Sequence, residues 1–137
     1  MTSINKSIII NLNNIYDQNK GINTSLNSRY LYAQLRRNDL TKIKIELEQQ
    51  IRKNKICFDW PGILRFEWHL KNYKKDPDNI SSAGRKVILD AMQKATNLSG
   101  EIFLKNDSLK FITGFVDDFF VDKKIDHPFV KIVFIKQ

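Results

Sequence analysis

The segment that decides the fold is Gly62–Leu70, with the sequence GILRFEWHL. Apolar residues occupy every second position from Leu64 to Leu70, and Arg65, Glu67 and His69 occupy the positions between them. Successive side chains of a β-strand point to opposite faces of the sheet, so this alternation predicts a strand with one buried face and one exposed face. The segments on either side of this strand then define the class of fold.

Two amphipathic helices are predicted around this strand. In Arg29–Asn54, apolar residues recur at spacings of three, four and four from Leu40 to Ile51, which makes one apolar stripe on a helix. Asn38 and Asp39 could cap a second helix, so this segment is compatible with one helix or two. After the strand, the apolar positions of Ile80–Ala95 predict another helix with one buried face.

Three further strands are predicted toward the two ends of the chain. Ser7–Leu12 is short and β-branched. Lys110–Val121 and Phe129–Ile135 are joined by Asp122–Pro128, which suggests a C-terminal antiparallel hairpin. The element order β-α-β-α-β-β predicts a mixed α/β fold with a mixed sheet, and the length suits a single domain over residues 1–137.

The chain is basic, and its positive charge is unevenly distributed. It has 137 residues and a formal net charge of +8 at pH 7. Residues 1–60 contain ten Lys and Arg against five Asp and Glu, and residues 61–99 contain seven against four, whereas residues 100–137 contain six of each. Basic side chains attract phosphates and carboxylates hold cations, so the distribution favours a nucleic-acid partner and suits a metal-dependent nuclease. The alternative is a solvated surface without such a partner.

Other features of the composition exclude several classes of protein. The single cysteine, Cys57, excludes an internal disulfide and a zinc site made of several cysteines. Its apolar neighbours Ile56 and Phe58 predict that it is buried. No apolar run reaches the roughly 18 to 20 residues that cross a bilayer, and Ile8–Ile10 is too short for the core of a signal peptide. We therefore expect a cytoplasmic protein with no membrane partner.

The segment with the most specific chemistry is Lys74–Asn79, with the sequence KKDPDN, between the central strand and the second helix. Asp76 and Asp78 are two residues apart, and like charges so close are costly unless a cation or hydrogen bonds compensate them. Mg²⁺ prefers a few carboxylate oxygens together with water molecules, so the pair is a candidate metal site. The alternative is that Asp78 or Asn79 only caps the helix that begins at Ile80.

Further short motifs stand before and after this loop in a definite order. They are Ser25-Leu26-Asn27, Arg36-Arg37, Lys74–Asn79, Lys86–Ala91, Lys105-Asn106-Asp107, Gly114–Asp117 and Val121-Asp122-Lys123. By these motifs, from Ser25 nearly to the C-terminus, the chain resembles the RusA family of Holliday-junction endonucleases, in particular its phage-derived Gram-positive branch. One departure is Asn97–Leu104, a longer stretch than in that family, preceded by Thr96 where the family has glycine.

The resemblance implies a homodimeric, Mg²⁺-dependent endodeoxyribonuclease, with Mn²⁺ as a substitute metal, that resolves four-way DNA junctions in recombination and repair. It implies catalytic and metal-binding roles for Asp76, Asp78 and Asp107, and a catalytic role near the scissile phosphate for Lys86. Asp90 matches a further acid, which either supports the metal or pairs with Lys86. The residues assigned to DNA binding are Asn27, Arg29, Arg36, Arg37, Lys74, Lys75 and Arg85.

The proposed metal site requires three acids to meet in space. The strand that ends near Leu70 and the strand that starts near Lys110 are predicted neighbours. We therefore expect their loops to bring Asp76, Asp78 and Asp107 together. A non-catalytic protein that binds branched DNA is the alternative function, and an RNA-directed nuclease of similar chemistry is a third and weaker one.

The role of two neighbouring acids and the location of the dimer interface are each open to more than one interpretation. Asp117 and Asp118 lie on a predicted strand, where they could form a second acidic site or protect an exposed strand edge. A junction resolvase needs two symmetric cuts, which a twofold dimer provides. The C-terminal hairpin and the first helix are both candidates for the interface of that dimer.

Overall fold

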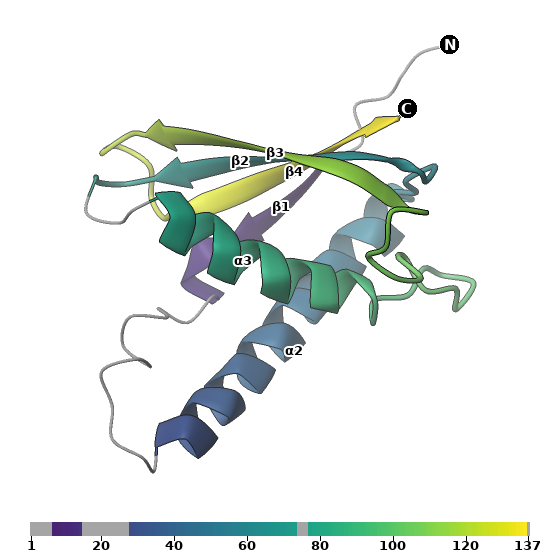
Figure 1. The fold of residues 1–137 in the computed structure, drawn as a ribbon, viewed down its shortest axis with the longest axis horizontal. Coiled ribbons are helices and arrows are strands. Elements are labelled where there is room, and N and C mark those ends of the chain that lie inside the picture. Colours follow the sequence, from purple (N-terminus) through teal and green to yellow (C-terminus); the bar gives the residue numbers. More distant parts are fainter. Residues whose placement is uncertain (1–6, 15–27, 74–76, 137) are drawn as a thin grey trace.

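The computed structural model describes residues 7–14, 28–73 and 77–136, with the side chains of these ranges except those of residues 14, 28–36, 78 and 79. Its elements are β1 (Ser7–Asn11), a short 3-10 turn η1 (Leu12–Asn14), α2 (Ser28–Asn54), β2 (Gly62–Leu70), α3 (Pro77–Met92), β3 (Ile112–Val121) and β4 (Phe129–Lys136). Figure 1 shows these elements in one small domain. The predicted α/β class and the order β-α-β-α-β-β are confirmed.

The four strands form one mixed sheet in the order β1-β4-β2-β3. The central strand β2 is parallel to β3 and antiparallel to β4, and β1 is antiparallel to β4. The predicted C-terminal hairpin is therefore wrong, because β3 and β4 run in opposite directions on either side of β2. The connection Asp122–Pro128 is longer than a typical hairpin loop of two to five residues, and it crosses over the end of β2 (Figure 1).

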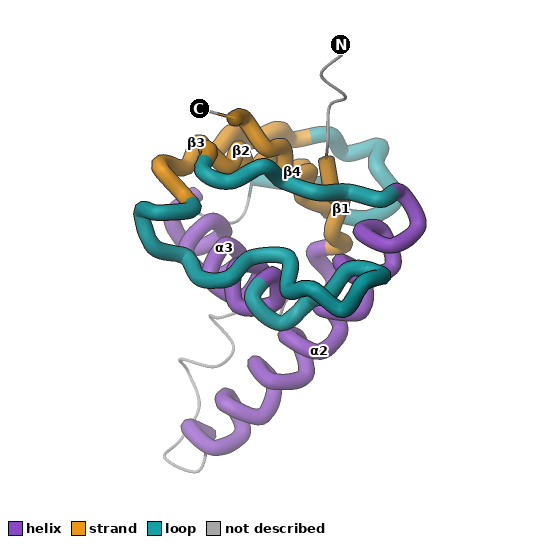
Figure 2. The backbone as a smooth tube through the Cα atoms, turned by 90° about the vertical axis from the view of Figure 1, so that its right-hand side faces the viewer, coloured by secondary structure: helices purple, strands orange, loops and turns teal. Residues whose placement is uncertain are grey.

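Both helices cover the same face of the sheet, and no other helix or strand of the described residues covers the opposite, open face (Figures 1 and 2). Leu64, Phe66 and Trp68 of β2 have no exposed surface and point toward the helices. Arg65 and Glu67 alternate with them and are only half-buried. The alternation read from GILRFEWHL is thus confirmed, with the apolar face against the helices.

The segment Ser28–Asn54 forms one continuous helix. Ile43, Leu47 and Ile51 are buried against the sheet, as the apolar stripe predicts. The first half of α2 extends past the sheet in Figure 1. Among the described residues, no helix is both long enough and apolar enough to cross a membrane.

Helix α3 begins earlier than the sequence predicts. It runs from Pro77 to Met92, whereas the prediction was Ile80 to about Ala95. Proline is well tolerated in the first turn of a helix, because its missing N–H would have no partner there. Asp78 and Asn79 therefore belong to the first turn of α3 rather than to the residues that precede it.

The connection between α3 and β3 folds back under the end of α3. The N–H of Leu104 donates to the C=O of Met92 at 3.1 Å, and the N–H of Phe103 donates to the C=O of Ala95 at 2.8 Å. The longer stretch Asn97–Leu104 thus contains a compact turn, in which Gly100 adopts a positive φ of 81° that suits glycine.

Cys57 is exposed, so the prediction that it is buried is wrong. Its neighbours Ile56 and Phe58 are 8% and 3% exposed and face the core. In an extended segment, successive side chains point in opposite directions. Two buried neighbours therefore turn Cys57 toward solvent.

Candidate functional site

The last three residues of the KKDPDN segment, Pro77, Asp78 and Asn79, form the first turn of α3, whereas the sequence predicted that they precede the helix. Lys74, Lys75 and Asp76 lie outside the described residues. The backbone of Asp78 lies in the first turn of α3, and its side chain is not among those described. A carboxylate at this position would be stabilised by the positive end of the helix dipole.

Asp107 lies in the connection that leads into β3, and its side chain is exposed. A tight turn holds this part of the chain. The N–H of Ser108 donates to the side-chain oxygen of Asn106 at 3.0 Å, and the N–H groups of Phe111 and Ile112 both donate to the C=O of Ser108 at 3.0 Å. The carboxylate of Asp107 is therefore presented to solvent on a structured turn at the start of β3.

Within one chain, Asp78 and Asp107 lie at opposite ends of the sheet, so the expected convergence of these acids is wrong. β2 and β3 are indeed neighbours, but they are parallel, with Gly62 opposite Ile112 and Leu70 opposite Val121. The loop after β2 therefore meets the end of β3, whereas Asp107 precedes its start (Figure 1). Helix α3 alone has 16 residues, which is about 24 Å at ~1.5 Å per residue.

The other two α3 residues assigned to the site lie farther along the helix. Lys86 is exposed and Asp90 is half-buried. Lys86 follows Asp78 by eight residues, which corresponds to about 12 Å along the helix axis. Lys86 and Asp78 thus lie on different turns of α3.

Arg85 is held by groups of the same chain. Its guanidinium lies 3.2 Å from Oδ2 of Asp117 and 4.6 Å from the centroid of the Phe115 ring. The other oxygen of Asp117 accepts a hydrogen bond from Nε1 of Trp68 at 2.9 Å. Arg85 therefore connects α3 to β3, and its guanidinium is engaged by side chains of the same chain.

Asp118 also has a cationic partner. Its Oδ2 lies 3.3 Å from Nε of Arg65 across the open face of the sheet, although the two groups lack hydrogen-bond geometry. With Asp117 paired to Arg85, neither carboxylate of β3 is left to form a second acidic site. The Arg65–Asp118 pair depends on the register of β2 and β3, and the Arg85–Asp117 pair depends on how α3 packs against β3. The sequence alone reveals neither.

The solvent-exposed side of α2 carries several cations. Arg37, Lys42 and Lys53 are exposed and lie outside the buried stripe of Ile43 and Ile51. Arg29 and Arg36 belong to the same helix, although their side chains are not among those described, and Asn27 lies outside the described residues. An exposed basic helix can follow a phosphate backbone, so this face is the candidate nucleic-acid interface.

The open face of the sheet carries aromatic residues that the sequence analysis missed. His69 stacks between Phe120, with ring centroids 4.9 Å apart, and Phe129, with centroids 4.4 Å apart. These three residues are aligned by the pairing of β2 with β3 and with β4. Only the alternation of His69 with Arg65 and Glu67 hinted that it lies on this face.

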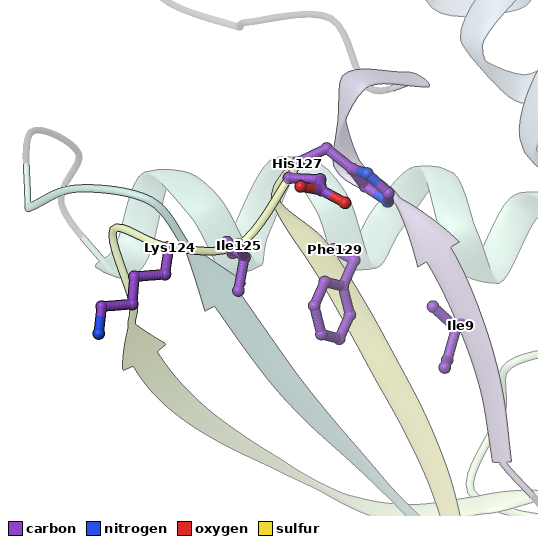
Figure 3. Close-up of a pocket in the computed structure, with 6 residues that line it drawn as sticks. Ile9, Lys124, Ile125, His127 and Phe129 are labelled. Atoms are coloured by element: carbon purple, nitrogen blue, oxygen red, sulfur yellow. The ribbon is translucent and has the colours of Figure 1, made fainter.

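A shallow depression of about 410 Å³ lies beside this row, between β1 and the turn that precedes β4 (Figure 3). It is lined by Ile9, Lys124, Ile125, Asp126, His127 and Phe129. Among the described side chains assigned to the site, Lys86, Asp90 and Asp107 do not border it. In the ranges that the structure describes, no group of three or more His, Cys, Asp or Glu side chains is placed to hold a metal ion.

Comparison of the chain with protein families, with curated proteins and with solved structures gave no match in any of the three. The resemblance to the RusA family therefore rests on the motifs in the sequence. Of those motifs, the structure places Pro77, Asp78 and Asn79 in the first turn of α3, and Asp107 in the connection that leads into β3 at the other end of the sheet.

Proposed function

We propose that this protein is a Mg²⁺-dependent endodeoxyribonuclease that cuts four-way DNA junctions as a homodimer in the cytoplasm. The observation that carries the proposal is the KKDPDN segment at the entry to α3, in a chain with a net charge of +8. Two carboxylates separated by one residue suit a hard cation. Two lysines in the same segment suit the phosphates that a nuclease must approach.

In phosphodiester hydrolysis, the carboxylates and the lysine of this site would have different roles. A Mg²⁺ ion held by carboxylates would stabilise the negative charge that develops during phosphodiester hydrolysis and activate a water molecule. Asp76 and Asp78 would hold the ion at the entry to α3. Lys86, exposed on the same helix, would offer a point charge or a proton to the leaving oxygen.

The second candidate is a protein that binds branched DNA without cutting it. The observation that favours it is the distance between the entry to α3 and Asp107, because one chain alone does not bring the three acids together. In this alternative, Asp78 stabilises the first turn of α3, and the basic face of α2 provides the affinity for DNA.

Incubation with a synthetic four-way junction separates the two candidates. We expect cleavage with Mg²⁺ or Mn²⁺ and none with EDTA. Asp78→Asn should abolish cleavage, since the metal loses a ligand, and junction binding should be equal or tighter, since a charge that repels phosphate is removed. Asp59→Asn, which changes an exposed carboxylate at the other end of β2, is the matched control and should cut normally.

Two results would contradict the nuclease assignment. Tight binding of the junction without cleavage in either metal favours the binding protein. Full cleavage by Asp78→Asn shows that this carboxylate holds no essential metal, because Asn replaces Asp well in a purely structural role near a helix N-terminus.

A further inference from the structure

Three rings lie side by side across the open face of the sheet, one each from β3, β2 and β4. His69 stacks on Phe120 with ring planes 15° apart and on Phe129 with ring planes 11° apart. Strand register fixes this row, because His69 is paired with Phe120 in β3 and with Phe129 in β4. The rings therefore form a series of nearly parallel planes that ends at Phe129.

The fourth strand supplies no ring to continue the row. The residue of β1 opposite Phe129 is Asn11, and its side-chain oxygen accepts a hydrogen bond from the N–H of Asn13 at 2.8 Å. Ile9, on the same face of β1, is 46% exposed. His69 thus covers one side of the Phe129 ring, and the depression of about 410 Å³ lies on the side toward β1 (Figure 3).

Helix α2 holds β1, the wall of the depression that carries Ile9. The N–H of Ile9 donates to Oε1 of Gln50 at 2.8 Å, and Nε2 of Gln50 donates to the C=O of Ile9 at 2.6 Å. The N–H of Asn11 donates to Oε1 of Glu46 at 2.9 Å. Side chains of α2 thus occupy the backbone groups through which another strand would bind to β1. A ligand of the depression must therefore be recognised by side chains rather than by strand addition.

The opposite wall of the depression comes from the turn between β3 and β4. Ile125 is an apolar part of this wall, and Asp126 and His127 add a carboxylate and an imidazole. The ring of His127 lies edge-on to that of Phe129, with planes 67° apart. Nζ of Lys71 donates to the C=O of Asp126 at 3.3 Å, which attaches this turn to the end of β2. The depression thus combines apolar walls and one side of an aromatic ring with polar groups at its rim.

A flat aromatic ligand suits this arrangement. Aromatic rings prefer offset stacking at centroid distances of about 4.5–7 Å, so a ring placed on Phe129 would continue the row across the sheet. A nucleobase is such a ring, and its edge carries donors and acceptors that a carboxylate and an imidazole can bind. A base inside a duplex has both faces stacked and its edge paired. Only an unpaired base can therefore enter.

Charge and location favour DNA as the source of that base. The chain has a net charge of +8, which attracts a phosphate backbone. The depression lies at the end of the sheet where β2 ends and α3 begins (Figure 1). In Figure 3 the amine of Lys124 points away from Phe129, so recognition in the depression depends on stacking rather than on a phosphate contact.

We propose that this depression binds one unpaired nucleobase of DNA, stacked on Phe129 with its edge at Asp126 and His127. The proposal deepens the proposed function and rests on it for the choice of DNA. Moving a base out of the stack costs least where pairing is already disturbed. A branch point offers such bases, so this site would favour branched DNA over an intact duplex.

Methyl NMR of the full chain, titrated in EDTA with a single-stranded oligothymidylate, tests the site directly. The methyl resonances of Ile9 and Ile125 should shift, because the ring current of a base stacked on Phe129 acts on both walls. Ile135 is the internal control, since it is 38% exposed on the same face at the far end of β4. Its methyl resonances should not move. The same oligothymidylate annealed to its complement should shift neither wall.

Two variants test whether stacking supplies the affinity. Phe129→Leu removes the ring but keeps apolar bulk, and it should weaken binding of the oligothymidylate about tenfold, the order expected for one base–aromatic stack. The slope of log affinity against log salt should not change, because stacking releases no counterions. Phe115→Leu is the matched control, since it removes a ring that is 40% exposed and does not border the depression. Ile9→Ala changes an exposed wall residue and should also weaken binding, which tests the site without altering the ring row.

Four results would overturn the inference. The first is binding of the oligothymidylate without methyl shifts at Ile9 and Ile125, and the second is equal shifts with the duplex. The third is unchanged affinity in both Phe129→Leu and Ile9→Ala. The fourth is methyl shifts that depend on protein concentration without DNA, which would assign the depression to a second copy of the chain.

The failure of this inference and the failure of the proposed function give different results. The titration is made in EDTA and requires no cleavage. A wild-type protein that cuts no junction but shows the methyl shifts overturns the proposed nuclease and keeps the base site. A wild-type protein that cuts junctions but shows no shifts overturns the base site and keeps the nuclease.

Discussion

Glu48 of α2 accepts a hydrogen bond from the backbone N–H of Thr96, at 2.9 Å and 48 residues away in the sequence. The hydroxyl of Thr96 lies 3.2 Å from the same oxygen. Arg52 also reaches Thr96, with Nε donating to its C=O at 3.2 Å. These contacts attach the connection between α3 and β3, which carries Asp107, to the long helix.

The pKa of Glu48 lies below its ordinary value of 4.5. Partial burial acts to raise this pKa, but the hydrogen bonds from Thr96 and the positive charges of Lys44 and Arg52 outweigh it. A carboxyl with a lowered pKa stabilises the folded state above its ordinary pKa, and this stabilisation disappears as the pH falls through the folded-state value.

We therefore expect Glu48→Gln to lower the free energy of unfolding by roughly 1–2 kcal/mol at pH 7. The difference from the wild type should shrink as the pH falls below 4.5, the ordinary value. Urea unfolding across pH 3 to 7 measures this difference. Glu101→Gln, an exposed change in the same connection, should have little effect at any pH. An equal loss for Glu48→Gln at pH 3 and pH 7 would show that charge is not the cause.

Gln50→Ala should open the edge of the sheet at β1. The two hydrogen bonds between Gln50 and Ile9 would be lost, and each contributes about 0.5–1.5 kcal/mol to stability. We expect a lower urea midpoint and concentration-dependent aggregation in light scattering, because the backbone of Ile9 becomes available to other strands. Gln49→Ala, at an exposed position, is the control. Equal behaviour of the two variants would mean that Gln50 does not close this edge.

Gly62→Ala should destabilise the protein at the start of the central strand. An added Cβ would overlap the ring of Phe134 and come within 2.7 Å of the C=O of Ile135. Such overpacking typically costs 1–3 kcal/mol, which urea unfolding would detect. Gly114→Ala is the control in the neighbouring strand, since its nearest atom is Cγ1 of Ile63 at an ordinary 3.5 Å. Unchanged stability of Gly62→Ala would show that the ring of Phe134 and the backbone of Ile135 can move aside.

Charge reversal at Arg36 and Arg37 should flatten the salt dependence of DNA binding. Each phosphate neutralised on duplex DNA contributes about −0.9 to the slope of log affinity against log salt. The double change to Glu should reduce that slope for a four-way junction, as measured by fluorescence anisotropy. The matched double change at Lys123 and Lys124, both exposed between β3 and β4, should leave it nearly unchanged. An unaltered slope for the first variant would remove α2 from the DNA interface.

Several elements could be predicted because they depend on local periodicity. The alternation in Gly62–Leu70 and the apolar spacing from Leu40 to Ile51 match the observed strand and helix. The sequence also predicted a helix soon after the KKDPDN segment, because proline and acidic residues are typical of helix starts, and α3 begins within that segment at Pro77. The start of α3 was missed by three residues, since a proline inside the first turn resembles the loop before it.

The pairing of strands could not be predicted, because it depends on which strand lies at the centre of the sheet. Two consecutive strands suggested a hairpin, but β2 lies between them and pairs with both. The same topology separates Asp78 from Asp107, since parallel neighbours bring their like ends together. The arginine partners of Asp117 and Asp118 depend on this register and on the packing of α3, so the sequence did not predict them either.

By itself, the sequence determined the class of fold, the faces that are buried and the position along the chain of the acidic KKDPDN segment. These features depend on residue type and on spacing along one chain. Only the tertiary structure decided that β2 is central, that Gln50 and Glu46 close one edge of the sheet, and that β3 leaves the other edge open. The physical reason is that nearly every residue has the same backbone N–H and C=O groups, so the hydrogen bonds between strands do not reveal which strands will pair. Their partners are set by how the helices and strands pack as a whole.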